Sequence, residues 1–204
     1  TSETHEWVRS LKECNGKLGL YGFSYQGFTQ LTGELNSKPP DCLSPAMTGM
    51  NIKDHWCSDG GAYWWHNNIA WGLQIAALKM KREKKLLEWE KIRLALENKS
   101  YLREGIDILK KYDPNSFVLE WLKNLNIARP FEEFKPISTW IKQPMLIIGG
   151  LWDPHLKGAF DLYKISKEAG GNPEIIIGNA THLNWWKGSQ ESLLKFFDKH
   201  LKSD

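Results

Sequence analysis

The sequence predicts an α/β fold in which a parallel sheet carries a helical insertion. Short, continuously apolar strands alternate with helical segments in residues 1–58 and 136–204. This alternation is typical of a parallel sheet that is covered on both faces. From residue 59 to about residue 126 the apolar pattern is helical instead, which interrupts the alternation. We therefore expect a sheet domain formed by 1–58 and 136–204, with a helical cap inserted at 59–135.

The first part of the chain begins with a helix and then gives a strand–helix–strand pattern. Trp7, Val8 and Leu11 recur at helical spacing, and Asn15-Gly16 is a turn signal before the first strand. The elements expected here are a helix at 6–13, a strand at 17–23, a helix at 26–35 and a strand-like run at 42–50.

The insertion and the C-terminal part supply the remaining elements. The segment 69–78 is apolar almost all round, which predicts a buried helix, and Ser100 is a candidate N-cap for the helix at 101–112. The expected elements are helices at 69–78, 86–96, 101–112 and 117–125, a strand at 145–148, a helix at 158–171, a strand at 173–182 and a helix at 191–201.

Composition narrows the class of protein. The chain has 204 residues and a net charge of +3, with no basic stripe interleaved with aromatic residues, so we expect no nucleic-acid partner. We expect no membrane partner either, because no apolar stretch is long enough to cross a bilayer. The three cysteines suit no zinc site and cannot all pair, which favours free thiols in a reducing, cytoplasmic compartment.

The stretch GFSYQG raises the question of a nucleophilic serine. Ser24 follows a predicted strand and precedes a predicted helix, as a nucleophile elbow requires. Gly22 lies two residues before Ser24, but the closing glycine, Gly27, lies three residues after it instead of two. The bland alternative for Ser24 is an ordinary turn serine.

Two further residues fit the chain order serine, acid, histidine. Asp153 follows the apolar strand MLII and the short run GGLW, and His182 follows EIIIGNAT, so both leave the carboxyl ends of predicted parallel strands. His182 would accept the Ser24 proton, and Asp153 would fix the imidazole tautomer. The alternative for Asp153 is a structural role in a turn or as a helix cap. The alternative for His182 is a structural role as the cap of the last helix.

Four stretches resemble one group of α/β-hydrolases. NGKLGLYGFSYQGFTQ is similar to that group's approach to its serine, and residues 60–78 resemble the start of its helical cap. QPMLIIGGLWD resembles the strand that ends in the acidic triad residue, and THLNWWKGSQESLLKFFDKHL resembles the histidine loop with its helix. The group contains cocaine esterase, X-Pro dipeptidyl-peptidases, α-amino acid ester hydrolases and related acyl esterases.

The resemblance implies a serine hydrolase that cleaves acyl esters or amides and needs no cofactor or metal. Ser24, Asp153 and His182 would form its triad, and the backbone N–H of Tyr25 would supply one oxyanion donor. The partner is then a small-molecule ester or amide. The alternative from a different class is a non-catalytic remnant that serves as a binding or interaction module.

The resemblance also implies that the sequence is a partial chain with the C-terminal half of the sheet. In the group, a tyrosine hydroxyl from a segment before the nucleophile strand supplies the second oxyanion donor, and this segment is not among the 204 residues. We expect the 17–23 strand to have an open edge that pairs with the missing N-terminal part or with another chain. We also expect the 204-residue chain alone to be essentially inactive.

Tryptophan is unusually frequent, with 11 residues. Several lie close in sequence to the cap entry or to the acid loop, which predicts an aromatic-lined pocket for an apolar acyl group. For each residue taken singly, packing in the core is the alternative. The pocket candidates are Trp56, Trp64, Trp65, Trp71, Trp152 and His155.

Overall fold

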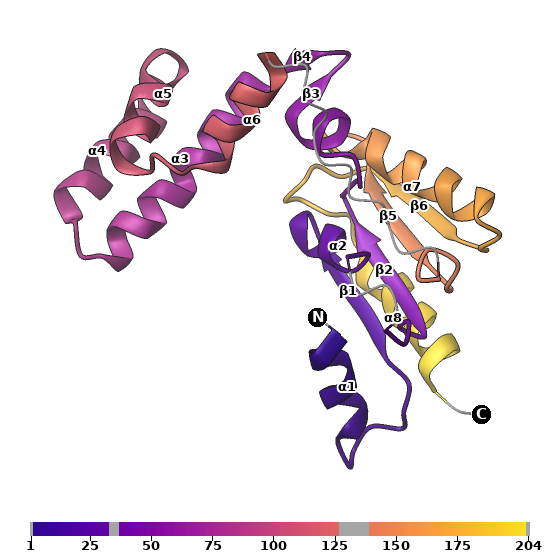
Figure 1. The fold of residues 1–204 in the computed structure, drawn as a ribbon. Coiled ribbons are helices and arrows are strands. Elements are labelled where there is room, and N and C mark those ends of the chain that lie inside the picture. Colours follow the sequence, from indigo (N-terminus) through magenta and orange to yellow (C-terminus); the bar gives the residue numbers. More distant parts are fainter. Residues whose placement is uncertain (1, 33–36, 127–138, 203–204) are drawn as a thin grey trace. The chain divides into compact units, whose positions relative to one another are not determined.

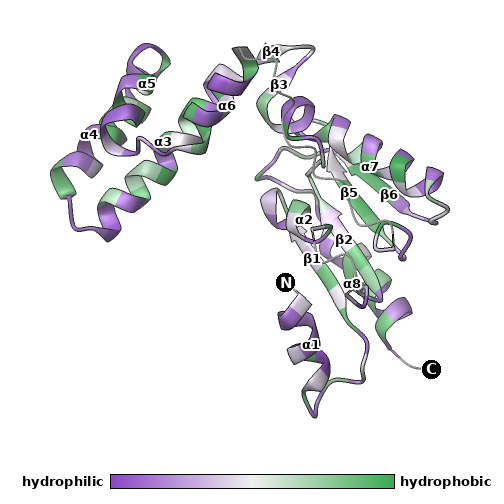
Figure 2. Cartoon of the chain, in the orientation of Figure 1, coloured by the Kyte–Doolittle hydropathy of each residue, from purple (hydrophilic) through white to green (hydrophobic). Residues whose placement is uncertain are grey.

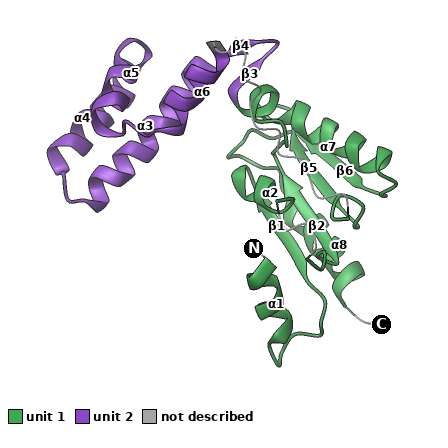
Figure 3. Ribbon diagram, viewed as in Figure 1, with its two compact units in different colours: residues 1–56, 133–204 green, residues 57–132 purple. Residues whose placement is uncertain are grey.

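The computed structural model describes residues 2–32, 37–126 and 139–202, and the chain forms two compact units. Unit 1 comprises residues 1–56 and 133–204, and unit 2 comprises residues 57–132 (Figure 3). Unit 2 is thus one continuous segment between two segments of unit 1. The predicted insertion begins two residues later than unit 2 and ends three residues later. Its predicted end at 135 lies outside the described residues.

Unit 1 is built on a four-stranded parallel sheet with the strand order β1-β2-β5-β6 (Figure 1). The two central strands are buried at every position, whereas the edge strands are partly exposed. A continuously apolar strand suits the centre of a parallel sheet because helices cover both of its faces. The strands are β1 (Gly19–Phe23), β2 (Cys42–Ala46), β5 (Leu146–Gly150) and β6 (Glu174–Gly178).

Helices cover the two faces of this sheet. On one face, Leu43 and Ile147 pack with residues of α2 (Tyr25–Thr29) and α7 (Leu156–Glu168). On the other face, Cys42, Leu146 and Ile148 pack with Phe196 of α8 (Ser189–Leu201). Alternate residues of each central strand therefore point to opposite layers, as the period of two requires. The remaining helices of this part are α1 (Ser2–Ser10) and a π-helical turn, η1 (Lys53–Cys57).

Unit 2 is a group of helices around an apolar core. It begins with a short hairpin and continues with four helices. Hydrophilic and hydrophobic residues are interspersed along each of these helices (Figure 2). Its core contains Ile69 and Leu73 of α3, Ile92 of α4, Leu109 of α5 and Val118 of α6, all fully buried. The elements are β3 (Ser58–Asp59), β4 (Ala62–Tyr63), α3 (Trp65–Arg82), α4 (Leu86–Glu97), α5 (Tyr101–Tyr112) and α6 (Phe117–Asn126).

Several expected elements of unit 1 are shorter than the sequence pattern suggests, including the strands expected at 17–23 and 173–182, which are β1 and β6. The run predicted as a strand at 42–50 ends at Ala46, because Met47 has φ 44°, which an extended strand does not accommodate. The helix predicted at 26–35 is α2 (Tyr25–Thr29). Residues 33–35 of that predicted helix lie outside the described residues.

Candidate active site

Ser24 occupies a strained turn between β1 and α2. Its backbone has φ 59° and ψ −134°, a combination that non-glycine residues rarely adopt. Its N–H donates to the carbonyl of Ala46 at 2.9 Å, which fixes the turn to the end of β2. Ser24 occupies the N-cap position of α2, but its side chain makes no cap hydrogen bond to that helix. The turn holds Ser24 at the carboxyl end of the sheet.

The contacts of Gly22 and Gly27 explain why the second glycine lies three residues after Ser24 instead of two. A Cβ on Gly22 would lie 2.7 Å from the Cβ of Gln26, so Gly22 alone leaves room for the side chain two residues after Ser24. A Cβ on Gly27 would lie 2.8 Å from Cγ2 of Thr48. Gly27 is therefore needed where α2 packs against the segment after β2, not at the turn itself.

Asp153 and His182 form a direct hydrogen bond. His182 Nδ1 lies 2.5 Å from Asp153 Oδ2, and the Asp153 side chain is fully buried whereas that of His182 is 27% exposed. Asp153 Oδ1 accepts a second bond from the backbone N–H of His155 at 2.7 Å. A carboxylate that accepts from Nδ1 leaves Nε2 of a neutral imidazole as the proton acceptor. The pair therefore provides a base whose tautomer is fixed.

Neither Asp153 nor His182 is the N-cap residue of the helix that follows it. The N-cap position of α7 is His155 and that of α8 is Gly188, six residues after His182. Asp153 does make a local turn bond through Oδ1, but its other oxygen is bonded to His182, 29 residues away in sequence. The cap alternative for His182 therefore finds no support in this geometry.

All three residues lie just beyond the carboxyl ends of parallel strands. Ser24 follows β1 directly, while Asp153 and His182 come three residues after β5 and four residues after β6. The ring of Phe23, the residue before Ser24, lies 5.5 Å from the ring of His182, measured between centroids. The Ser24 turn and the His182 loop therefore lie close together at one edge of the sheet, and the catalytic roles of the three residues stay a prediction.

The predicted pocket residues of unit 1 differ in their exposure. Trp152 is 68% exposed, and its indole N–H donates to Asn179 Oδ1 at 2.9 Å. Trp56 and His155 are instead buried, with ring centroids 4.3 Å apart. Of the three, Trp152 offers the surface that a ligand needs. The pocket role of all three stays a prediction.

The other predicted pocket residues, Trp64, Trp65 and Trp71, belong to unit 2. Trp65 is partly exposed and donates its indole N–H to the carbonyl of Leu102 at 2.9 Å. Trp71 packs against Phe117, with ring centroids 4.6 Å apart, so it contributes to the aromatic packing between α3 and α6. Their assignment to an acyl pocket likewise stays a prediction.

Sequence reasoning missed a polar cluster next to this site. His55 is buried, and its Nε2 lies 2.8 Å from Asp161 Oδ2, which also accepts from Lys157 at 2.7 Å. The backbone carbonyl of His55 accepts a 2.6 Å bond from His155 Nδ1. Burial lowers the pKa of His155 to about 4. The spacing of Lys157 and Asp161 on one helix face was the only signal in the sequence.

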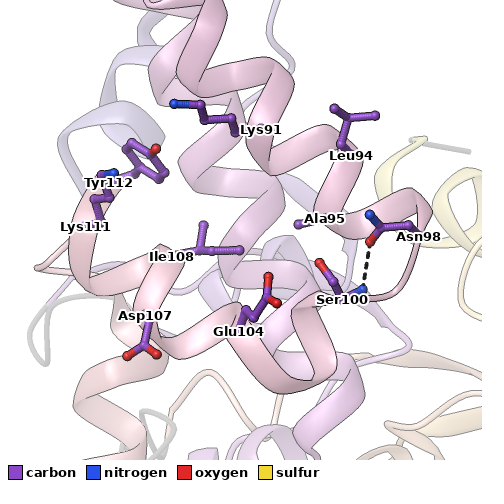
Figure 4. A pocket seen from close by; sticks show the side chains of 10 residues that line it. All are labelled: Lys91, Leu94, Ala95, Asn98, Ser100, Glu104, Asp107, Ile108, Lys111 and Tyr112. Carbon is purple, nitrogen blue, oxygen red and sulfur yellow. Dashed lines mark hydrogen bonds between the residues drawn. The ribbon is translucent and has the colours of Figure 1, made fainter.

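Metal ligation, membrane spanning and a surface groove are the remaining features of the described residues. No group of three or more histidine, cysteine, aspartate or glutamate side chains in the described part of the chain could hold a metal ion. No described helix is both long and apolar enough to cross a membrane. Unit 2 has an open groove between α4 and α5, lined by Lys91, Ile108 and Tyr112 among others (Figure 4). None of the predicted site residues lines this groove.

A four-stranded parallel sheet flanked by helices gives the chain the α/β architecture that the sequence predicts. The family model of the X-Pro dipeptidyl-peptidases (S15 family) matches residues 1–184. The chain therefore belongs to this family of serine peptidase- and esterase-like hydrolases. No curated protein was found to match the chain.

Solved structures share the fold. A Bacteroides ovatus protein assigned as a dipeptidyl aminopeptidase IV is 13% identical, with a TM-score of 0.51 over 98% of this chain and 22% of its own. An acylaminoacyl peptidase in complex with Z-Gly-Gly-Phe-chloromethyl ketone is 17% identical, with a TM-score of 0.51 over 98% of this chain and 27% of its own. The chain thus spans about a quarter of the length of these two proteins.

Proposed function

We propose that this chain carries the catalytic core of a serine hydrolase that cleaves acyl ester or amide bonds. Ser24 is the nucleophile, His182 the general base and Asp153 the residue that orients the base. The observation that carries the proposal is the 2.5 Å bond between His182 Nδ1 and Asp153 Oδ2, together with the strained turn at Ser24, whose side chain makes no cap hydrogen bond. A purely structural role in a turn or a helix cap would require neither feature.

The proposed chemistry follows from this arrangement. His182 Nε2 accepts the Ser24 proton as Oγ attacks the carbonyl carbon, and Asp153 stabilises the imidazolium that forms. The backbone N–H of Tyr25 donates to the oxyanion. Collapse of the intermediate transfers the proton from His182 to the leaving alcohol or amine and leaves an acyl group on Ser24. Water then attacks the acyl-enzyme, with His182 again serving as the base.

The proposed substrates are acyl esters and amides with an apolar or aromatic acyl group. The family includes X-Pro dipeptidyl-peptidases, so amides after proline belong to the range to be tested. The exposed Trp152 next to Asp153 supports an aromatic contact to the substrate. A panel of p-nitrophenyl esters and X-Pro p-nitroanilides would order these classes by kcat/KM.

The experiment that tests the proposed function is labelling with a fluorophosphonate probe. The protein encoded by the complete reading frame around these residues should be labelled, and Ser24→Ala should abolish both labelling and ester turnover. Ser10→Ala, an exposed serine of α1, is the matched control and should behave as the wild type. Labelling that survives Ser24→Ala would contradict the assignment. A wild type that is neither labelled nor active would favour the non-catalytic interaction module.

We further propose that the 204-residue chain alone is essentially inactive and that strand β1 pairs with preceding strands of the same hydrolase domain. β1 is an edge strand of the described sheet, and Tyr21 at its middle is 72% exposed. An unpaired parallel edge leaves backbone groups for another strand to bind. Ester turnover and molar mass of the isolated chain test this. A monomer as active as a complete esterase would contradict it, and a stable dimer would identify a second copy as the partner.

We also propose a reducing, cytoplasmic compartment. Cys14, Cys42 and Cys57 are all free thiols, and Cys42 and Cys57 are buried. Burial raises the pKa of both buried thiols to about 12, so they are poor candidates for disulfide exchange. Unchanged thiol titration after isolation under non-reducing conditions, with three free thiols per chain in denaturant, would support this compartment. A recovered disulfide would contradict it.

A further inference from the structure

His155 lies against the proposed Asp153–His182 pair without being one of its members. Its backbone N–H donates to Asp153 Oδ1 at 2.7 Å, and its ring centroid lies 5.2 Å from that of His182. The Trp56 ring also packs against the His155 ring, at 4.3 Å between centroids. His155 is only 5% exposed. A buried imidazole that touches a proposed catalytic histidine fixes the space in which that histidine can move.

The His155 ring is itself held by a specific acceptor. Its Nδ1 lies 2.6 Å from the carbonyl oxygen of His55, and because a carbonyl only accepts, Nδ1 carries the proton. In a neutral ring this fixes the tautomer. The orientation of the ring is therefore set by the position of the His55 backbone.

The His55 backbone is fixed in turn by its own side chain. The N–H of Asn51 donates to His55 Nδ1 at 3.1 Å, so Nε2 is the donor to Asp161 Oδ2 at 2.8 Å. His55 lies in the π-helical turn η1, a local distortion of helix geometry that often accompanies functional sites. A Cβ on Gly49 would lie 2.4 Å from His55 Nδ1, which shows how closely the ring is enclosed.

From these contacts we infer that His155 is a positioning residue: anchored by its Nδ1–H on the His55 carbonyl, it holds Asp153 and His182 in the orientation that the proposed hydrolysis requires. The inference rests on the proposed function for its catalytic consequence, but not for its geometry. In this role His155 acts through Asp153 and His182, independently of any contact with substrate.

The charge state of His155 agrees with this role. Burial lowers its pKa to about 4, so the ring is neutral around neutral pH. A neutral neighbour allows His182 to become the imidazolium that the proposed reaction forms, whereas a second cation in contact would oppose that step. The groups that face His155 are Asp153, which favours its protonation, and His182 and His55, which oppose it when charged.

The test compares two substitutions in the protein from the complete reading frame. His155→Asn retains an N–H donor near the position of Nδ1, whereas His155→Leu has a comparable volume without the donor. Both retain the backbone N–H that Asp153 accepts. Circular dichroism and thermal unfolding establish that each variant is folded at the temperature used. Two readouts follow: kcat and KM for a p-nitrophenyl ester, and the far-downfield proton NMR signal of the short His182 Nδ1–Asp153 bond.

We expect His155→Leu to lower kcat by about 10²-fold with little change in KM, the cost of a misplaced catalytic group. Its downfield signal should broaden or disappear, and His155→Asn should restore most of both readouts. A Leu variant with wild-type kcat and signal would overturn the inference, and so would equal losses in the Leu and Asn variants. If the wild type shows no turnover, the proposed function fails, while the NMR comparison still decides whether His155 positions the pair.

Discussion

The sheet unit and the helical unit bury different kinds of side chain. In unit 1 the described buried residues include the imidazoles of His55 and His155 and the carboxylate of Asp153. In unit 2 the described buried residues include no imidazole and no carboxylate, and the buried core is built from residues such as Leu73 and Leu109. Burial of ionisable groups costs free energy unless they are hydrogen-bonded. The buried ionisable groups of the candidate site are hydrogen-bonded.

From this difference we expect unit 1 to carry the proposed chemistry and unit 2 to depend on packing. Polar burial is retained in unit 1 where three strand ends meet, around the proposed nucleophile, base and acid. In unit 2 the helices pack around an apolar core, so a substitution that disrupts this core should lower the stability of the unit. Substitutions in the two units should therefore separate: loss of activity with little loss of stability in one, and the reverse in the other.

The largest expected effect is on activity, at Ser24. Ser24→Ala should lower kcat by on the order of 10⁴- to 10⁶-fold while the free energy of unfolding stays close to that of the wild type. His182→Ala and Asp153→Asn should lose a comparable share, and double variants should lose little more, because such residues act as a unit. Steady-state ester kinetics with matched thermal unfolding measure both. Near-wild-type turnover by Ser24→Ala would end the account.

The next effect is on stability, in the helical unit. Leu109 of α5 is fully buried, so Leu109→Ala should lower the free energy of unfolding of unit 2 by about 3 kcal/mol. Leu102→Ala, a partly exposed leucine of the same helix, is the control and should cost less than about 1 kcal/mol. Denaturant unfolding measures the two. If Leu109→Ala abolished probe labelling of Ser24 below its unfolding transition, packing and chemistry would not separate as proposed.

A smaller effect is the pH dependence of stability in the sheet unit. The pKa of His155 falls from its usual 6.5 to about 4 because it is buried, so the neutral form stabilises the fold fully above 6.5. That stabilisation is lost as the pH falls from 6.5 toward 4, which amounts to about 2 kcal/mol between pH 7 and pH 5. Burial lowers the pKa of His55 in the same direction.

Unfolding in denaturant at the two pH values tests this sign. His155→Asn should lose less stability on acidification than the wild type, because it removes the buried base. Ser10→Ala, at an exposed and non-titrating position of α1, is the control and should lose as much stability on acidification as the wild type. A wild type that is more stable at the lower pH would contradict the assignment of a neutral buried imidazole.

The smallest expected effect concerns the substrate pocket. Trp152→Ala should raise KM for a bulky aromatic ester by about two- to tenfold, and should change KM for an acetyl ester less, because an aromatic contact is lost. Trp7→Ala, an exposed tryptophan of α1, is the matched control. Equal increases for both esters would indicate a general packing defect instead of a pocket role.

The fold could be predicted because its strands have a continuous apolar pattern, and each of the three proposed catalytic residues follows one of these strands. Parallel strands bring their carboxyl ends to one edge, so Ser24, Asp153 and His182 all lie at that edge whatever their separation in sequence. The end of β2 could not be predicted, because the positive φ of Met47 is set by the junction and not by its residue type. The hydrogen bond from His155 to a backbone carbonyl could not be predicted either, because a contact with the backbone leaves no pattern in the sequence.

Identification of the acylated residue tests the central claim most directly. The protein from the complete reading frame is mixed with a slowly deacylating p-nitrophenyl ester, quenched in acid during the burst of p-nitrophenol release, and digested for mass spectrometry. The account predicts one acyl group per active chain, on Ser24, and none in Ser24→Ala. An acyl group on any other residue, or turnover with no burst and no modified peptide, would contradict it.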